Sequence, residues 1–307
     1  MLNHRGARPS RLFESLAAAI VAERERVGSG PLPKDAERRL RIDCVLASAR
    51  VAGSSLERAE VAALLERGLA LGGRPLGEYL LVADYGEALA LVESLAPPSR
   101  RRPWLSLEEI VHLHAAAVRR ASGGEPGRFR TTVAAALPSD AVPPAPWLVA
   151  RDLGHFVERL AGGPPARDEP LRWVAEAHLR FERIRPFACG NGRVGRLVVT
   201  LLLRRLGFPS VPFPLARVPY LAALRRADAG DRRPLAILLA RATLRALSSL
   251  GDEAGAASGA LRPLASFACG AERAALYKAA QRGRLRTVRR GRRLFVRADW
   301  IAAYRDS

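Results

Sequence analysis

The sequence predicts a mainly α-helical protein with one short β-hairpin in its body and a small, strongly basic C-terminal domain. Apolar residues recur at three- and four-residue spacing over most of the chain, as in Leu12, Leu16 and Ile20, which indicates amphipathic helices. Strand-like patterns are confined to residues 129–133 and 287–296, so the body cannot contain a large sheet.

The expected helices follow from this spacing and from the residues that interrupt it. The helix that begins after Ser106 has a capping-box spacing, because Glu109 follows three residues later. Helices are expected over residues 11–27, 38–71, 84–95, 106–120, from 147 onward, 172–185, 192–206, 220–227, 233–250, 271–282 and 299–304.

The chain is strongly basic. Its 307 residues include 50 Lys+Arg and 30 Asp+Glu, a net charge of +20, which favours phosphate-rich partners. Nearly all the cations are arginines, so GC-rich codon usage is an alternative source of part of the excess. Residues 261–307 contain twelve basic and three acidic residues, a net of +9, so the charge is concentrated at the C-terminus.

Cysteine spacing and hydropathy indicate the cellular compartment in which we expect the protein. Cys44, Cys189 and Cys269 lack C-x-x-C spacing, which argues against both a disulfide framework and a zinc site. The apolar runs are far shorter than a membrane span, and residues 1–10 are followed by no apolar signal region. We expect a cytoplasmic protein with no membrane partner.

The most informative stretch is the loop over residues 184–197, IRPFACGNGRVGRL. Pro186 ends the preceding helix, and Gly190 and Gly192 permit the backbone conformations of an anion-binding turn. The next helix is expected to begin at about Gly192, so its N–H groups and positive end would face a phosphate, with two arginines closing over it. The alternative is an ordinary glycine-rich turn between helices.

This loop resembles the signature of the Fic (Fido-fold) family, usually written H-P-F-x-[D/E]-G-N-G-R-x-x-R. Pro186 and Phe187 match, as do the residues that the family would use to bind a nucleotide: Gly190, Asn191, Gly192, Arg193 and Arg196. The resemblance spans residues 84–250. It implies a Fic helical core, ATP or another nucleotide as the ligand, and a substrate-binding hairpin that begins at Gly127 and can contact a protein target near Phe129.

Two departures from the signature concern catalysis. Arg185 stands where the family has the histidine that accepts a proton from the target hydroxyl, and a guanidinium cannot accept it. Cys189 replaces the acidic residue that binds Mg²⁺, so no metal site is expected. Losing a general base costs about 10²- to 10⁴-fold in rate. Glu182 is a candidate substitute base, and Cys189 is either a reactive thiol or a small space-filler.

The segment VLASARVAG, residues 45–53, resembles the inhibitory helix motif of the same family, [S/T]-x-x-x-E-[G/N]. Ser48 and Gly53 match, whereas Ala52 replaces the glutamate that would pair with the second motif arginine. The alternative is a plain helix end with Gly53 as its left-handed cap. Both interpretations predict that residue 52 does not neutralise Arg196.

The basic C-terminal segment resembles an excisionase-type or MerR-like winged helix-turn-helix. The resemblance rests on 276–278, 283–285, 291–293 and Tyr304. It implies DNA binding, with docking onto a protein as the alternative. The candidate DNA-binding residues are Arg273, Lys278, Arg289, Arg290, Arg292 and Arg293.

The sequence therefore predicts four regions: an N-terminal helical region (1–83), a Fic core (84–250), a flexible linker (251–260) and a basic winged-helix domain (261–307). We expect a nucleotide-binding regulator that is deficient in AMP transfer and binds DNA through its C-terminus. One alternative is an active Fic protein adenylyltransferase, or AMPylator, with atypical catalytic residues. Another is an inactive scaffold that binds a peptide by strand addition near Phe129.

Overall fold

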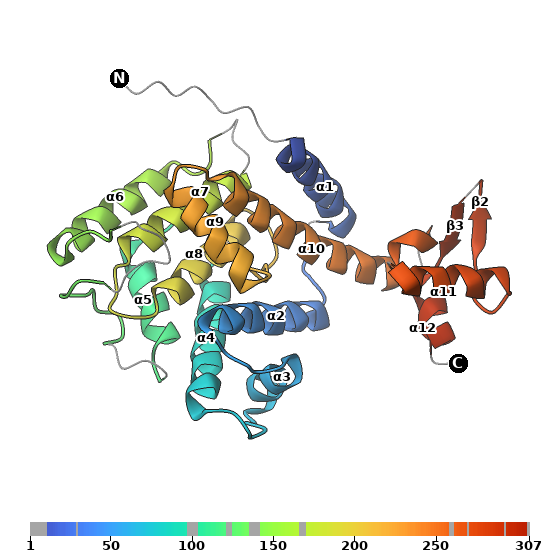
Figure 1. Cartoon of the computed structure of the whole chain (residues 1–307), viewed down its shortest axis with the longest axis horizontal. Coiled ribbons are helices and arrows are strands. Elements are labelled where there is room, and N and C mark those ends of the chain that lie inside the picture. Colours follow the sequence, from blue (N-terminus) through green and yellow to red (C-terminus); the bar gives the residue numbers. More distant parts are fainter. Residues whose placement is uncertain are drawn as a thin grey trace. The chain divides into compact units, whose positions relative to one another are not determined.

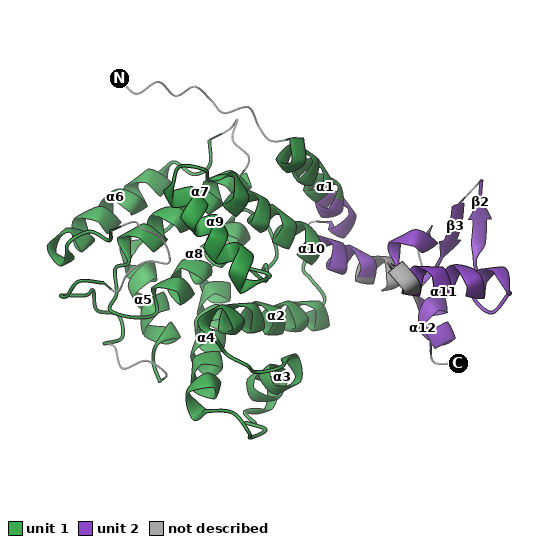
Figure 2. Ribbon diagram, viewed as in Figure 1, with its two compact units in different colours: residues 1–22, 29–246 green, residues 23–28, 247–307 purple. Residues whose placement is uncertain are grey.

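The structure of the chain is a computed structural model. It describes residues 11–28, 30–96, 104–120, 125–134, 142–165, 170–257, 261–268, 270–291 and 293–305. The chain divides into two compact units, one of residues 1–22 and 29–246 and one of residues 23–28 and 247–307 (Figure 2).

The first unit is built from helices, which confirms the predicted mainly α class (Figure 1). In chain order the helices are α1 (Arg11–Val27), α2 (Lys34–Ala52), α3 (Arg58–Arg67), α4 (Leu76–Leu95), α5 (Leu107–Ala117), the 3₁₀ turn η1 (Pro146–Leu148), α6 (Val149–Ala161), α7 (Pro170–Ile184), α8 (Asn191–Arg205), α9 (Arg217–Asp228) and α10 (Arg233–Ala257). The C-terminal ends of α1 and α10 belong to the second unit.

Helix α8 lies at the centre of the helical unit. It packs against α4, α5 and α7 and contacts α2. Residues 197–203 are buried on every side of the helix, and the Thr200 hydroxyl donates to the Arg196 carbonyl within the helix at 3.0 Å. A helix that is apolar all round is typical of a core position. The N-terminus of α8 is therefore held by a rigid element.

Two predicted features of the N-terminal half differ in outcome. The capping box is confirmed, because the Glu109 N–H donates to Ser106 Oγ at 3.1 Å and the Ser106 N–H donates to the Glu109 carboxylate at 3.0 Å. The single helix predicted over 38–71 is wrong. Gly53, with φ of 98°, ends α2, and its N–H donates to the Arg50 carbonyl at 3.1 Å. A left-handed glycine thus breaks a pattern whose apolar spacing continues across it.

The strand predicted at residues 129–133 is also absent from the described part of the chain. The Arg130 N–H donates to the Pro186 carbonyl at 2.9 Å, so this segment contacts the motif loop. Residues 135–141, where the hairpin would return, lie outside the described residues. The buried Arg130 guanidinium donates to main-chain carbonyls of Arg185, Thr132 and Pro144 at 2.6, 3.0 and 2.6 Å.

Helix α10 continues to Ala257, through most of the segment that was predicted to be a flexible linker. Extending an existing helix avoids the cost of nucleation, and alanine has the highest helix propensity. Residues 251–257 can therefore be helical although they lack regularly spaced apolar residues.

The second unit contains a small three-stranded antiparallel sheet. Its elements are β1 (Arg262–Pro263), the 3₁₀ turn η2 (Leu264–Ser266), α11 (Gly270–Gln281), β2 (Val288–Arg290), β3 (Arg293–Val296) and α12 (Ala298–Arg305), with strand order β1-β3-β2. The predicted hairpin and both predicted helices are confirmed, whereas β1 was not predicted. The buried core is formed by Leu264, Leu276, Ala279, Leu285, Val296 and Ile301, with Trp300 and Tyr304 packed against it.

No helix in the described part of the chain is both long enough and apolar enough to cross a membrane.

Candidate functional site

The motif loop joins α7 to α8. Gly190 is the N-cap of α8 and has φ of 73°, a left-handed conformation that glycine adopts without strain. A Cβ at this position would lie 2.5 Å from Val118 Cγ1, so a side chain is excluded by sterics as well. Helix α8 begins at Asn191, one residue before the predicted start. These features place the first turn of α8 directly after a tight turn, as the sequence predicts.

The Asn191 side chain closes this loop. Its Oδ1 accepts from the Phe187 N–H at 2.9 Å, and its Nδ2 donates to the Phe187 carbonyl at 2.7 Å. Asn191 is buried, with 3% of its surface exposed. Its amide therefore shapes the loop, and its contribution to a ligand would come from the backbone.

His114 on α5 packs against the motif loop and hydrogen-bonds to it. Its ring stacks on Phe187 with ring centroids 3.6 Å apart, and its Nδ1 accepts from the Gly127 N–H at 2.9 Å. Nε2 therefore carries the proton and donates to the Cys189 carbonyl at 3.2 Å. Burial lowers the pKa of His114 to about 4, so the ring stays neutral and keeps this pair of hydrogen bonds.

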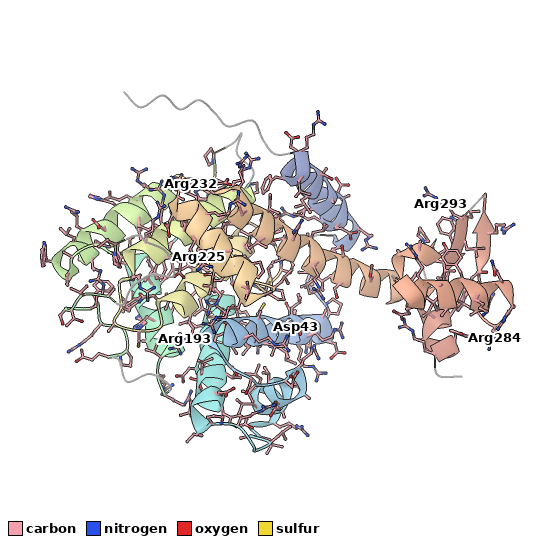
Figure 3. The ribbon with its side chains drawn as sticks, viewed as in Figure 1. Asp43, Arg193, Arg225, Arg232, Arg284 and Arg293 are labelled. Atoms are coloured by element: carbon pink, nitrogen blue, oxygen red, sulfur yellow. The ribbon has the colours of Figure 1, made fainter. Side chains whose placement is uncertain are left out.

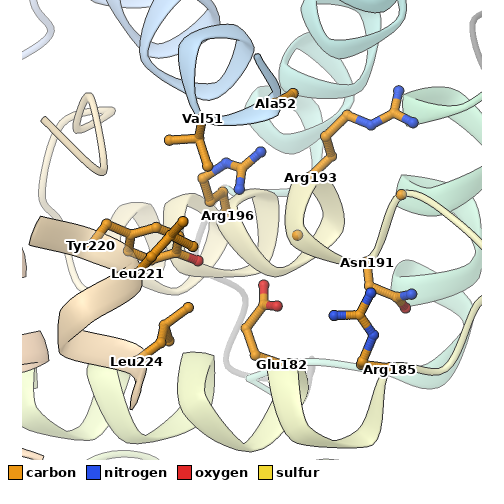
Figure 4. A pocket seen from close by; sticks show the side chains of 12 residues that line it. Val51, Ala52, Glu182, Arg185, Asn191, Arg193, Arg196, Tyr220, Leu221 and Leu224 are labelled. Atoms are coloured by element: carbon orange, nitrogen blue, oxygen red, sulfur yellow. The ribbon is translucent and has the colours of Figure 1, made fainter. Parts of the chain in front are cut away.

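A pocket of about 260 Å³ lies beside the first turn of α8 (Figure 4). It brings together the end of α2, the end of α7, the motif loop and α9. Its lining residues are Val51, Ala52, Glu182, Arg185, Gly190, Asn191, Gly192, Arg193, Arg196, Tyr220, Leu221 and Leu224. All five predicted nucleotide-binding residues thus line one pocket, together with Arg185.

The two motif arginines of α8, Arg193 and Arg196, contact different parts of the unit. Arg193 is buried and donates to the Ala117 carbonyl at the end of α5. Arg196 Nε donates to Ser48 Oγ of α2 at 3.0 Å. The prediction that both guanidinium groups close over one ligand therefore needs a correction: in this structure, as Figure 4 shows, they diverge from the helix. Side chains three residues apart are neighbours, but their ends follow their own hydrogen-bond partners.

The end of α2 meets the motif as the resemblance implies. Ser48 is fully buried against Arg196, and the exposed Ala52 lines the pocket. Gly53 is at the same time a left-handed helix cap. The two interpretations of this segment are therefore compatible, and residue 52 offers Arg196 no charged partner.

Arg185 and Cys189 occupy the two positions that depart from the signature. Arg185 has φ of 44°, a conformation that costs a non-glycine residue about 1 kcal/mol or more. Its Nε is buried and has no hydrogen-bond partner in the described part of the chain. No group of three or more His, Cys, Asp or Glu residues that could hold a metal ion occurs among the described residues.

Glu182 lies on α7, one turn before Arg185, and its carboxylate points into the pocket (Figure 4). Only 7% of the residue is exposed, and Oε1 has no hydrogen-bond partner among the described residues. Burial raises the pKa of Glu182, while Arg196 and then Arg185 lower it by a smaller amount. A buried carboxyl group without a partner is a frequent feature of functional sites.

Sequence reasoning missed the polar residues in and around the pocket wall. His178 Nε2 and the Tyr220 hydroxyl are 2.8 Å apart, and Tyr85 and Tyr220 both interact with the Arg196 guanidinium. These residues come from α7, α9 and α4 and belong to no local motif. Their only sequence signal is a polar residue within an apolar helical face.

The candidate DNA-binding residues lie in the second unit. Arg273 and Lys278 are exposed on α11, and Arg289, Arg290 and Arg293 are exposed on the hairpin. The labelled side chains of Arg284 and Arg293 point away from this unit (Figure 3). Arg292, the remaining candidate, lies outside the described residues.

Comparisons with known proteins agree with this geometry. The Fic/DOC family model matches residues 104–203. The chain is 29% identical over 225 residues to a protein adenylyltransferase Fic from Nematostella vectensis, covering 73% of this chain and 52% of that protein. It is 30% identical over 192 residues to protein adenylyltransferase fic-1 from Caenorhabditis elegans, covering 62% of this chain and 37% of that protein. The chain thus spans about half, or less, of the length of these curated relatives.

Solved structures share the fold. A fragment of Fic-1 from Caenorhabditis elegans superposes with a TM-score of 0.68 and 25% identity, covering 78% of this chain and 72% of that one. A Fic family protein from Desulfovibrio desulfuricans gives a TM-score of 0.66 at 19% identity, covering 96% and 98% of the two chains. The site geometry and the family model lead to the same conclusion: residues 104–203 form a Fic/DOC-type domain, and the chain shares the fold of these neighbours.

Proposed function

We propose that the pocket at the start of α8 binds the phosphates of a nucleotide, ATP or a relative, and that AMP transfer from it is inefficient. The observation that carries the proposal is the lining of the pocket, to which Arg185, Arg193 and Arg196 contribute beside the first turn of a buried helix. The N–H groups of that turn have no acceptors within the helix. Together with the helix dipole they favour an anion.

Arg185 is the main argument against efficient transfer. It lies in the pocket at the position of the family base, and a guanidinium remains protonated at any physiological pH. Its charge favours phosphate binding while it leaves the target hydroxyl without a base. Cys189 supplies a thiol where Mg²⁺ would need an oxygen ligand. We expect ATP to bind in this pocket, and we do not expect Cys189 to bind Mg²⁺.

The second candidate function is protein adenylylation with another base. Two observations favour it: the chain is similar to proteins named adenylyltransferases, and Glu182 lines the pocket with a buried Oε1 that has no hydrogen-bond partner among the described residues. A carboxylate in that position could accept a proton from a hydroxyl only if the target reaches it within about 3 Å.

The two candidates are separated by measuring ATP binding by calorimetry and transfer of labelled AMP to the protein itself and to a cell lysate. We expect the wild type to bind ATP without measurable transfer. The double variant Arg185→His with Cys189→Asp should gain transfer by about 10²-fold or more, since a general base contributes that much.

Arg180→His is the control, because it adds an imidazole on α7 at a residue whose side chain pairs with Glu176 instead of lining the pocket. Transfer by the wild type that is lost in Glu182→Gln would establish the adenylylating alternative. Failure of every variant to bind ATP would reject the nucleotide site itself.

We also propose that the second unit binds duplex DNA as a winged helix-turn-helix. Support comes from α11 followed by a two-stranded antiparallel hairpin, with exposed basic residues on both elements. Arg289 and Arg293 would contact phosphates, and Arg273 and Lys278 would approach the major groove. The chain would then combine a nucleotide-binding core with a DNA-binding module, as a regulator.

A contact with a protein target near Phe129 is a further part of the proposal. Val133 and Val142 are 82% and 89% exposed, and Trp147 is 80% exposed. Exposed apolar side chains on segments that adjoin the motif loop favour an extended apolar peptide as the partner.

A further inference from the structure

We propose that the pocket at the start of α8 binds its nucleotide in the metal-free form, and that Arg185 contacts phosphate oxygens that Mg²⁺ would otherwise coordinate. This inference rests on the proposed nucleotide site and specifies the ionic form of its ligand. Mg²⁺ then competes with the protein for ATP.

The side chains at the pocket do not fit a Mg²⁺ ion. In nucleotide sites this ion is bound by one or two carboxylates together with phosphate oxygens. Among the described residues that line the pocket, Glu182 has the only carboxyl group, and 7% of that residue is exposed. A Cβ at Gly195 would lie 2.7 Å from its buried Oε1, so this oxygen packs against α8. Cys189 does not line the pocket, and its thiol is a poor ligand for a hard cation.

Arg185 brings positive charge to the same pocket. Its side chain is partly exposed, lines the pocket and forms no ion pair or hydrogen bond within the described part of the chain. The N–H groups of such a guanidinium suit phosphate oxygens, which accept charge-assisted hydrogen bonds. The same charge repels a divalent cation, whereas a carboxylate in this place would attract one.

Two further arginines raise the positive potential around the pocket. Buried Arg130 donates to the Arg185 carbonyl at 2.6 Å, and its other acceptors are also main-chain carbonyls. Arg196 lines the pocket and donates to Ser48 Oγ at 3.0 Å. Neither guanidinium forms an ion pair with a described residue, so no carboxylate cancels its charge locally.

This distribution of charge selects the more negative form of the ligand. Mg²⁺ cancels part of the negative charge of ATP and occupies some of its phosphate oxygens. Mg·ATP therefore offers the arginines less charge and fewer acceptors than free ATP does. The pocket provides no carboxylate that compensates for this loss by binding the metal, so free ATP binds more tightly.

The test is calorimetry of ATP with the full chain at equal ionic strength, in one series with a chelator and in the other with Mg²⁺ in excess over ATP. We expect Mg²⁺ to raise the apparent Kd of the wild type about tenfold or more, because only the small metal-free fraction of ATP is competent to bind. In Arg185→Ala, metal-free ATP should bind less tightly and the ratio of the two Kd values should fall. Alanine is no more strained than arginine at φ of 44°, so the variant should fold.

Arg180→Ala is the matched control, because it removes the same charge from α7 at a residue that pairs with Glu176 and does not line the pocket. Its ratio of Kd values should equal that of the wild type. An unchanged ratio in Arg185→Ala would overturn the role of Arg185. If Arg185→Ala fails to fold, the ratio of the wild type decides alone.

Two results for the wild type would overturn the inference and leave the nucleotide site intact. One is an equal Kd for the two forms of ATP. The other is tighter binding in excess Mg²⁺, and loss of that gain in Glu182→Gln would then assign the metal to Glu182. Absence of ATP binding by all proteins in both series would instead reject the proposed function.

Discussion

His114 and His178 are held neutral inside the helical unit by burial. Their pKa values are lowered to about 4 and about 3, with desolvation as the largest cause in both cases. In the unfolded chain a histidine titrates near 6.5. The folded protein therefore binds fewer protons than the unfolded chain between these values, and the free energy of unfolding must fall as pH falls below about 6.5.

The first prediction concerns this loss. Lowering the pH from 7 to 5 should reduce the free energy of unfolding by about 2 kcal/mol for each of these histidines. His178→Gln keeps a polar group beside the Tyr220 hydroxyl but removes the titration, so its pH dependence should be smaller by about that amount. Urea unfolding at the two pH values measures the difference.

Exposed His155 on α6 provides the control. His155→Gln should leave the pH dependence of the wild type unchanged. An equal slope for His178→Gln and the wild type would show that His178 is not buried as a neutral ring.

At the scale of elements, the turn before α8 depends on the absence of a side chain at Gly190. This residue combines φ of 73° with a Cβ direction that ends 2.5 Å from Val118 Cγ1. Gly68, the C-cap of α3, has nearly the same φ of 67° and no heavy atom within 4 Å of its Cβ direction. Comparing the same substitution at the two glycines therefore separates the cost of backbone strain from the cost of a steric clash.

The second prediction follows from this pair. Gly68→Ala should destabilise the protein by about 1 kcal/mol, the cost of a left-handed alanine. Gly190→Ala should cost a further 1–3 kcal/mol, roughly the cost of overpacking, and should weaken ATP binding. Adding Val118→Ala to Gly190→Ala should recover part of this further loss. Urea unfolding gives the stabilities, and equal losses at the two glycines would contradict the packing argument.

The helices and the loop could be predicted from the sequence because their signals are local. Ser106 with Glu109 specifies a helix start, and Gly190 with Gly192 specifies a tight turn at a helix N-terminus. The strand at 129–133 was predicted wrongly, since the preference of Arg130 for the carbonyls of Arg185 and Pro144 is not a local signal. The partners of Arg193 and Arg196 were missed for the same reason. Ser48 is 148 positions from Arg196, and only the packing of α2 against α8 brings them together.

At the scale of the whole molecule, the chain contains two units with different surfaces. Residues 1–260 carry a net charge of +11 over 260 positions, and many of their arginines are in ion pairs, such as Arg58 with Asp43 at 2.8 Å and Arg74 with Glu60 at 3.4 Å. The second unit contains most of residues 261–307, whose net charge is +9. Exposed arginines on its hairpin have few acidic neighbours in the sequence. A concentrated positive surface of this kind attracts a polyanion, and the range of the attraction decreases as the salt concentration rises.

The last prediction tests that surface. Each phosphate that a protein neutralises contributes about −0.9 to the slope of log K against log salt concentration. If Arg289 and Arg293 contact DNA phosphates, Arg289→Ser with Arg293→Ser should make the slope less negative by about 2 and weaken binding at low salt. Both residues are exposed on the hairpin, so the variant should keep the stability of the wild type to within about 0.5 kcal/mol. Fluorescence anisotropy with a labelled duplex between 50 and 200 mM salt measures the slope.

The control is Arg67→Ser with Arg159→Ser, which removes the same charge from exposed positions of α3 and α6 and should change the slope little. Equal slopes for both double variants would mean that net charge alone attracts the duplex, and the hairpin arginines would then be a solvated face.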